Sequence, residues 1–173
     1  MSTVVHRTTK EVKLNIDSYS HDPVVWIINP DLSALIGVSI EYWKIVGDIV
    51  SEMSQPEKDV VDAAVLPVEI GSKVEQFRVA MRDFVYLRYA AERQQTLSVL
   101  RIEARLDGKI NRAAYIGQVL VWIDSCFDYF YAKAAEIMAC TTRIQVAAVT
   151  WDFTDLVTTD PNVTIYQSRT ILD

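Results

Sequence analysis

The sequence predicts an α+β protein: a small amino-terminal β module with a hairpin, then a helical bundle or helical hairpin, then a short β-prone carboxyl tail. Three observations lead to this fold class. Two short β-prone runs flank Gly47-Asp48, a pair typical of tight hairpin turns. Apolar residues then recur at spacings of three and four over residues 74–137, which is the period of a helix. β-prone residues return at 163–166. We therefore expect three parts: residues 1–53, 54–150 and 151–173.

The amino-terminal part contains two further β-prone segments. Val12, Leu14 and Ile16 alternate with polar residues, which predicts an edge strand or an extended arm. Residues 24–28 form a dense apolar run that Asn29-Pro30-Asp31 halts, because proline restricts the residue before it. Residues 32–35 then predict a single helical turn.

Two capping-box patterns mark helix starts in the middle of the chain. Ser54 and Glu57 have the required spacing, and Pro56 falls in the first turn, where its missing amide hydrogen costs little. We expect that helix to run from about Gln55 to Val65 and to end at Leu66-Pro67. Ser72 and Glu75 repeat the pattern and predict a second start.

The second helix carries an apolar stripe that fades and then resumes. The stripe consists of Val74, Phe77, Met81 and Phe84. It weakens through residues 88–95, so we expect a break or kink before Leu97, Leu100 and Ala104 continue it. Asp107-Gly108-Lys109 closes the helix, since glycine suits the left-handed conformation that follows a helix end.

The strongest helix begins at a predicted amino-terminal cap, Asn111. Its heptad seam contains Ala113, Ile116, Leu120, Ile123, Phe127, Phe130, Ala134 and Ile137. A second seam beside it contains Tyr115, Val119, Trp122, Cys126 and Tyr129. Two adjacent seams make the apolar face wider than one antiparallel neighbour covers, so a further partner is expected there. Thr141-Thr142 predicts the cap of a final short helix over residues 143–149.

The partner of the two-sided helix is either the β module or the same helix in another copy of the chain. We favour another copy, because acidic chains with long two-sided helices commonly assemble as symmetric bundles, and we expect a homo-oligomer with a trimer preferred. The β-prone tail offers a second means of pairing with a neighbour. The predicted contact residues are Tyr115, Val119, Trp122, Ile123, Cys126, Phe127, Phe130, Val163 and Ile165.

Composition excludes several classes of function. The chain has 173 residues, a net charge of -6 and a pI near 4.9, and such an acidic excess argues against a nucleic-acid surface. The amino end lacks the apolar core of a secretion signal, and no apolar run approaches the ~18 residues of a membrane span, so no membrane partner is expected. Cys126 and Cys140 fit buried small apolar side chains in a protein made in a reducing cytosol.

The sequence does not predict catalysis, a metal site or a cofactor. His6 and His21 are the only histidines, and neither has the ligand spacing of a zinc site. The chain has no glycine-rich phosphate loop, and no acid, base and nucleophile are placed to act together. The basic residues Arg101, Arg105, Lys109 and Arg112 are assigned to helix-end electrostatics rather than to a phosphate site. We therefore expect no enzyme.

Two sets of segments resemble a module and a following helical region of tailed-bacteriophage structural proteins. The module is carried by Asn29-Pro30-Asp31-Leu32-Ser33-Ala34-Leu35, Gly37-Val38, Tyr42-Trp43-Lys44-Ile45-Val46-Gly47-Asp48 and Glu57-Lys58-Asp59-Val60-Val61-Asp62-Ala63-Ala64. The helical region is carried by Arg93-Gln94-Gln95-Thr96-Leu97, Asn111-Arg112-Ala113-Ala114-Tyr115-Ile116, Trp122-Ile123, Tyr129-Phe130-Tyr131 and Trp151-Asp152-Phe153.

This resemblance implies a mechanical function in a virion, after synthesis in the host cytoplasm. The expected role is a tail-fibre, adaptor or tail-associated component that docks on other virion proteins without catalysis. A capsid-decorating or cement protein is the alternative within the particle. An assembly chaperone, absent from the mature particle, is the alternative outside it, and an enzyme or cytosolic regulator is the non-structural alternative.

Overall fold

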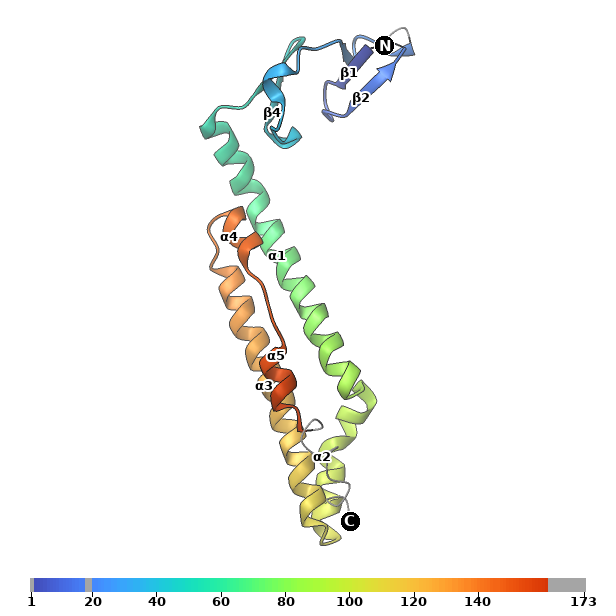
Figure 1. Ribbon diagram of the computed structural model, residues 1–173, viewed down its shortest axis with the longest axis vertical. Helices are drawn as coiled ribbons and strands as arrows, with labels where there is room; N and C mark the ends of the chain where they lie inside the picture. The colour runs from blue at the N-terminus through green and yellow to red at the C-terminus, as the bar shows by residue number, and fades with distance from the viewer. Residues whose placement is uncertain (1, 18–19, 162–173) are drawn as a thin grey trace. The chain divides into compact units, whose positions relative to one another are not determined.

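The computed structural model describes residues 2–17 and 20–161 and has the predicted α+β architecture (Figure 1). It divides into two compact units, Met1–Val65 and a second unit that begins at Leu66. Small antiparallel sheets make up most of the first unit. Three long helices pack as a bundle and short helices follow them.

The first unit contains a three-stranded antiparallel sheet with strand order β2-β1-β3. The strands are β1 (Ser2–His6), β2 (Val12–Ile16) and β3 (Trp26–Ile28). The edge-strand prediction for β2 is confirmed, whereas β1 was not foreseen as the central strand. Val4 and Val5 are adjacent and both 0% exposed, so this strand lacks the period-two alternation that marks a half-buried strand.

A two-stranded hairpin completes the β structure, as the sequence predicts. It joins β4 (Trp43–Val46) to β5 (Ile49–Glu52), and Gly47 at its turn has a φ of +61°. Two short 3-10 helices precede it, η2 (Ser33–Leu35) and η3 (Ile40–Tyr42). The core of this unit is small: Val5, Ile27, Leu35, Trp43 and Val50.

Helix α1 (Gln55–Arg88) begins where predicted, but two predictions within it are wrong. It continues through Pro67 instead of ending there, because Ile70 and Val74 beyond the proline pack against the helical core and outweigh the lost backbone hydrogen bond. Ser72 and Glu75 do not start a second helix. Their side chains instead accept hydrogen bonds from Gln76 and Arg78 within α1.

The predicted break after α1 is confirmed. Helix α2 (Ala91–Leu106) follows directly, and Gly108 has a φ of +73° before α3 (Ile110–Met138). The predicted cap at Asn111 is wrong, because α3 begins at Ile110 with Lys109 at the cap position and no side-chain cap bond. The turn closes through backbone bonds around Gly108 and leads straight into the helix.

A short helix replaces the predicted extended tail over residues 151–161, the part of that tail that the structure describes. Helix α4 (Arg143–Ala148) has the predicted cap, a complete capping box between Thr142 and Gln145. Helix α5 (Thr154–Thr159) contradicts the extended reading of the region after residue 150, because Leu156 is buried and its carbonyl oxygen accepts a bond from the Trp122 indole. The β-prone segment 163–166 lies outside the described residues.

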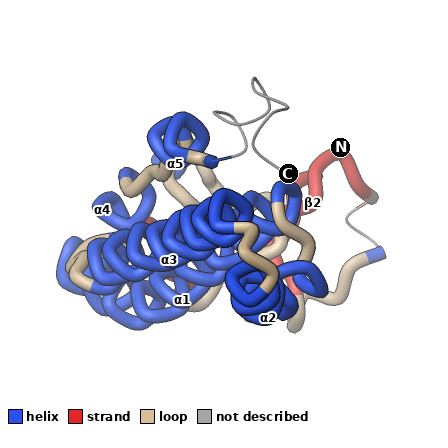
Figure 2. The backbone as a smooth tube through the Cα atoms, turned by 90° about the horizontal axis from the view of Figure 1, so that it is seen from below, coloured by secondary structure: helices blue, strands red, loops and turns tan. Residues whose placement is uncertain are grey.

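Aromatic rings form the core of the helical unit. Phe77 of α1 is 0% exposed and lies 5.4 Å from Phe130 of α3 and 4.8 Å from Trp151, measured between ring centroids. Phe153 extends the cluster with a centroid 4.5 Å from that of Phe84. Figure 2 shows α2 and α5 beside α3, in agreement with their contacts. In the described part of the chain, no helix combines the length and apolar character that a bilayer span requires.

Candidate functional site

The β4–β5 hairpin presents a pair of exposed apolar side chains at its tip. Val46 and Ile49 are direct cross-strand partners and are 60% and 69% exposed. The neighbouring pair, Ile45 and Val50, points to the opposite face, where Val50 is buried in the core. Successive side chains alternate between the faces of a strand, so the outward face of the hairpin is apolar at its tip. We call Val46 and Ile49 the hairpin patch.

Arg7, which follows β1, fixes the turn that carries the hairpin patch. Its Nη1 atom donates to the Gly47 carbonyl oxygen at 2.6 Å, and its guanidinium also pairs with the Asp48 carboxylate. Its Nη2 atom donates to the carbonyl oxygen of Pro23 at 3.0 Å. One side chain therefore ties the hairpin turn to the loop before β3, and the patch is held in a fixed position within its unit.

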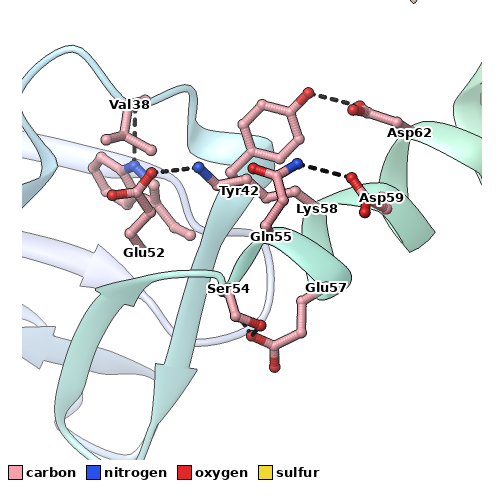
Figure 3. A network of polar contacts seen from close by, with 10 residues as sticks. Val38, Tyr42, Glu52, Ser54, Gln55, Glu57, Lys58, Asp59 and Asp62 are labelled. Atoms are coloured by element: carbon pink, nitrogen blue, oxygen red, sulfur yellow. Dashed lines mark hydrogen bonds and ion pairs between the residues drawn. The ribbon is translucent and has the colours of Figure 1, made fainter. Parts of the chain in front are cut away.

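A polar network joins the other end of the hairpin to the first turns of α1 (Figure 3). The Tyr42 hydroxyl donates to Asp62 at 2.6 Å, and Lys58 pairs with Glu52 at the end of β5. The Glu57 carboxylate accepts a hydrogen bond from the Ser54 backbone N–H at 2.9 Å. This is one of the two bonds of a capping box, the one from the residue at the cap to the acidic side chain three positions later.

Glu57 also pairs with Lys44 of β4, so this carboxylate links the hairpin to the helix start. The hydrogen bond from Lys44, followed by those from Ser54, lowers the pKa of Glu57 from 4.5 to about 2. Glu57 is therefore charged at every pH above its lowered pKa, and the link persists through the physiological range.

Four of the residues predicted to contact another subunit lie in the core instead. Their exposed fractions are 1% for Val119, 3% for Trp122, 7% for Ile123 and 0% for Cys126. Tyr115 and Phe130 are partly buried against the same core, and Phe127 is 46% exposed. Val163 and Ile165 lie outside the described residues. The prediction that the chain leaves the second seam of α3 uncovered is therefore wrong.

The second seam of α3 is covered by α1 and by the segment after α4. The sequence predicted the β module or another copy of the chain as its partner instead. Tyr89, just beyond α1, places its ring 5.4 Å from that of Trp122, measured between centroids. The Trp122 indole donates to the Leu156 carbonyl oxygen at 2.7 Å, and the Asp152 backbone N–H donates to the Tyr129 hydroxyl at 3.2 Å. The one available signal was Trp151 and Phe153, two large apolar residues in a segment with no strand period.

A buried carboxylate anchors the end of this covering segment. Asp160 is 2% exposed, accepts a bond from the Tyr89 hydroxyl at 2.9 Å and pairs with Arg88 Nε at 3.2 Å. Burial raises the pKa of the Tyr89 phenol above its usual value, and the bond to Asp160 adds to the shift. The phenol therefore stays protonated as a donor, and the sequence offered no signal for this pairing across 71 positions.

Cys126, His6 and His21 each pack against other side chains of the protein. Burial raises the pKa of the Cys126 thiol to about 12, so it is not a thiolate at neutral pH. His6 and His21 each lie edge-on to Trp26, with ring centroids 4.8 Å and 5.1 Å away. Among residues 2–17 and 20–161, no three His, Cys, Asp or Glu side chains are grouped to hold a metal ion.

The helical unit also keeps some apolar residues on its surface. Val99, Ile102 and Leu106 follow one face of α2 and are 54%, 60% and 82% exposed. We call these three residues the α2 stripe. Their spacing of three and four places them on one face of the helix.

Comparisons of this chain with protein-family models, with curated proteins and with solved structures found no match.

Proposed function

We propose that this chain is a non-enzymatic structural component of a bacteriophage particle, a tail-fibre, adaptor or tail-associated protein that docks on other virion subunits through its first unit. The observation that carries the docking role is the hairpin patch, two apolar side chains that are cross-strand partners and both more than half exposed. Single exposed apolar residues are ordinary on protein surfaces, whereas these two are adjacent to each other and held on a fixed element. The assignment to a phage particle rests on the sequence resemblance.

The geometry of the hairpin suits docking by two means at once. A two-stranded sheet has an outer edge on each strand, and an extended segment of a partner can pair with such an edge through backbone hydrogen bonds. The hairpin patch adds apolar contact at the same place. Because Arg7 and the network around Glu57 fix both ends of the hairpin, little conformational entropy is lost on binding.

The α2 stripe supports the expected homo-oligomer. With Val99 and Leu106 at a positions and Ile102 at d, the α2 stripe has the spacing of one coiled-coil heptad and can pack against α2 of another copy. The α2 stripe thus replaces the second seam of α3 as the basis for self-association, and a trimer stays the preferred state. Sedimentation velocity tests this: we expect a concentration-dependent trimer that Ile102→Lys converts to monomer, and a monomeric wild type contradicts it.

Quantitative mass spectrometry of purified particles tests the proposed function. We expect the chain in stoichiometric amounts in particles from cells that produce it. Val46→Ser with Ile49→Ser should reduce its incorporation about tenfold or more, because the pair contributes about 1.5–3 kcal/mol per fully buried side chain.

A matched control is Met138→Ser with Ile144→Ser, which removes two apolar side chains of similar exposure, 61% and 82%, from the other unit. This control should be incorporated like the wild type. Absence of the chain from particles whose assembly requires it would identify an assembly chaperone instead. Labelling on the capsid surface would identify a decorating protein.

A further inference from the structure

A groove in the helical unit lies between α2, α3 and α5. It has a volume of about 740 Å³, within the range of small-molecule binding sites. Its apolar wall includes Val121, Trp122 and Leu156, and its polar groups include Gln118, Ser125 and Thr159. Two charged side chains, Arg101 and Asp155, also line it.

Arg101 forms no ion pair among the described residues, although Asp155 lines the same groove. The Arg101 Nε atom is buried and has no hydrogen-bond partner in the described part of the chain. A buried guanidinium donor without an acceptor costs free energy, because it has lost water and gained no partner. Arg101 belongs to the basic cluster that was assigned from the sequence to helix-end electrostatics, and its Nε atom has no acceptor within the described protein.

Gly117 of α3 provides the space in which the Arg101 side chain lies. A Cβ atom at this position would lie 3.1 Å from the Arg101 Cζ and Nη2 atoms, closer than ordinary contact. The absence of a side chain at Gly117 thus lets the guanidinium lie against α3 at the groove. Arg101 is positioned by packing, although none of the described carboxylates holds it there.

The two charged residues that line the groove, Arg101 and Asp155, have opposite signs, so the charge that favours an acidic occupant comes from the stretch of chain that carries Arg101. Residues 91–112, which include α2 and the turn to α3, contain five Lys or Arg and three Asp or Glu, whereas the whole chain has a net charge of -6. This stretch is therefore a locally basic part of an acidic protein. An acidic segment is drawn to it and repelled by most of the remaining surface.

We propose that the groove binds a short acidic peptide segment of a partner protein, with one Asp or Glu carboxylate on the Arg101 guanidinium and an adjacent apolar side chain on the Trp122 and Leu156 wall. A carboxylate is the acceptor that a guanidinium binds most strongly. Asp155 favours a peptide over an inorganic anion, because a peptide also supplies backbone N–H donors for this second carboxylate. The partner is a neighbouring subunit, so its identity rests on the proposed function.

The experiment starts from a random dodecapeptide library selected on the immobilised full chain, and fluorescence anisotropy then measures the tightest peptide. We expect selected peptides with Asp or Glu next to Leu, Ile or Phe. Arg101→Gln should weaken binding about tenfold or more, since it removes a charge-assisted contact. Arg105→Gln, which removes an exposed arginine one turn further along α2, is the matched control and should bind like the wild type.

A change in the peptide tests the same contact if the Arg101→Gln chain does not fold. Replacing the Asp of the selected peptide with Asn should weaken its binding to the wild-type chain by a similar factor. The same peptide change should have no effect on binding to the Arg101→Gln chain, because the partner of the carboxylate is already removed.

Selected peptides without acidic residues, or equal binding by wild type and Arg101→Gln, would overturn the proposal. Competition by inorganic phosphate at the peptide's own concentration would replace it with a general anion site. No particles are used, so failure here leaves the hairpin patch untouched, and failure of particle incorporation leaves the groove untouched.

Discussion

The two units of this protein differ in the size of their buried apolar core. In the first unit, one cluster of five buried residues forms the core beneath the hairpin, and Val46 and Ile49 stay exposed at the hairpin tip. The helical unit encloses its largest side chains, with Phe77, Cys126 and Ile137 all 0% exposed. Polar links such as Arg7 to Gly47 hold the first unit's turn, whereas packed aromatic rings such as Phe77 and Phe130 hold the second unit. The second unit therefore has the larger buried core, although each unit also exposes apolar side chains, in the hairpin patch and in the α2 stripe.

The largest expected effect is the difference in stability between two variants of α3, Ile123→Asp and Phe127→Asp. It tests whether the buried side of α3 is covered by the same chain. Ile123 is 7% exposed and Phe127 is 46% exposed, although both belong to the same heptad seam. Ile123→Asp should destabilise the helical unit by about 4 kcal/mol or more, because it buries an unpaired charge. Phe127→Asp should leave that unit folded. Hydrogen-exchange mass spectrometry measures both, and equal loss of protection in the two variants would contradict the enclosure.

Asp160→Asn tests whether the covering segment depends on its anchor. The change leaves Arg88 without its ion-pair partner and weakens the acceptor of the Tyr89 hydroxyl bond. We expect a loss of about 2–3 kcal/mol in the free energy of unfolding of the helical unit. Exchange should increase first in residues 150–161. Asp152→Asn is the control, since Asp152 is exposed and its side chain accepts hydrogen bonds from residues within the same turn, such as Thr154.

Arg7→Gln extends the comparison to the first unit. It removes the bonds to the carbonyl oxygens of Gly47 and Pro23 and the pair with Asp48. We expect a loss of about 1–2 kcal/mol, because these contacts are partly solvated. Faster exchange should appear in β4 and β5 and not in α3. Faster exchange throughout the chain would show that the two units unfold together.

Lowering the pH gives the smallest expected effect, again confined to the first unit. The folded-state pKa of Glu57 lies at about 2, below its ordinary 4.5. The stabilisation is therefore complete above about pH 4.5 and is lost as the pH falls toward 2. A carbon-13 NMR titration of the Glu57 carboxyl checks this. In Glu57→Gln the start of α1 should show no such pH dependence, and a titration midpoint near 4.5 would contradict the link to Lys44.

Much of the fold was readable from local sequence. Gly47-Asp48 predicted the hairpin, Ser54 and Glu57 predicted the start of α1, and Gly108 predicted the end of α2, since each depends on neighbours a few residues away. The prediction that the helix ends at Pro67 was wrong, because packing of the turns after the proline outweighed the cost of placing proline inside a helix. The central strand β1 was not predicted, because it is buried on both faces and lacks the alternation of apolar and polar residues that marks a half-buried strand.

The candidate sites were harder to predict than the fold. The sequence identified α3 as a two-sided apolar helix, and Val119 and Cys126 are indeed buried, but in contact with this chain and not with another copy. The hairpin patch was present in the predicted hairpin, yet which strand face is exposed depends on the core beneath it. The exposure of Arg101 to a groove depends on Gly117, which lies 16 positions further along the chain.

The sequence by itself determined the class of the protein, the main turns and the helix faces, because helix period, capping and glycine conformation are set by residues within one or two turns. Only the tertiary structure decided which apolar faces are covered. The chain folds its own residues 151–160, anchored by Asp160, onto the surface of α3 for which the sequence predicted another partner. Such contacts join residues far apart in sequence, and their free energy depends on geometry that no local pattern encodes.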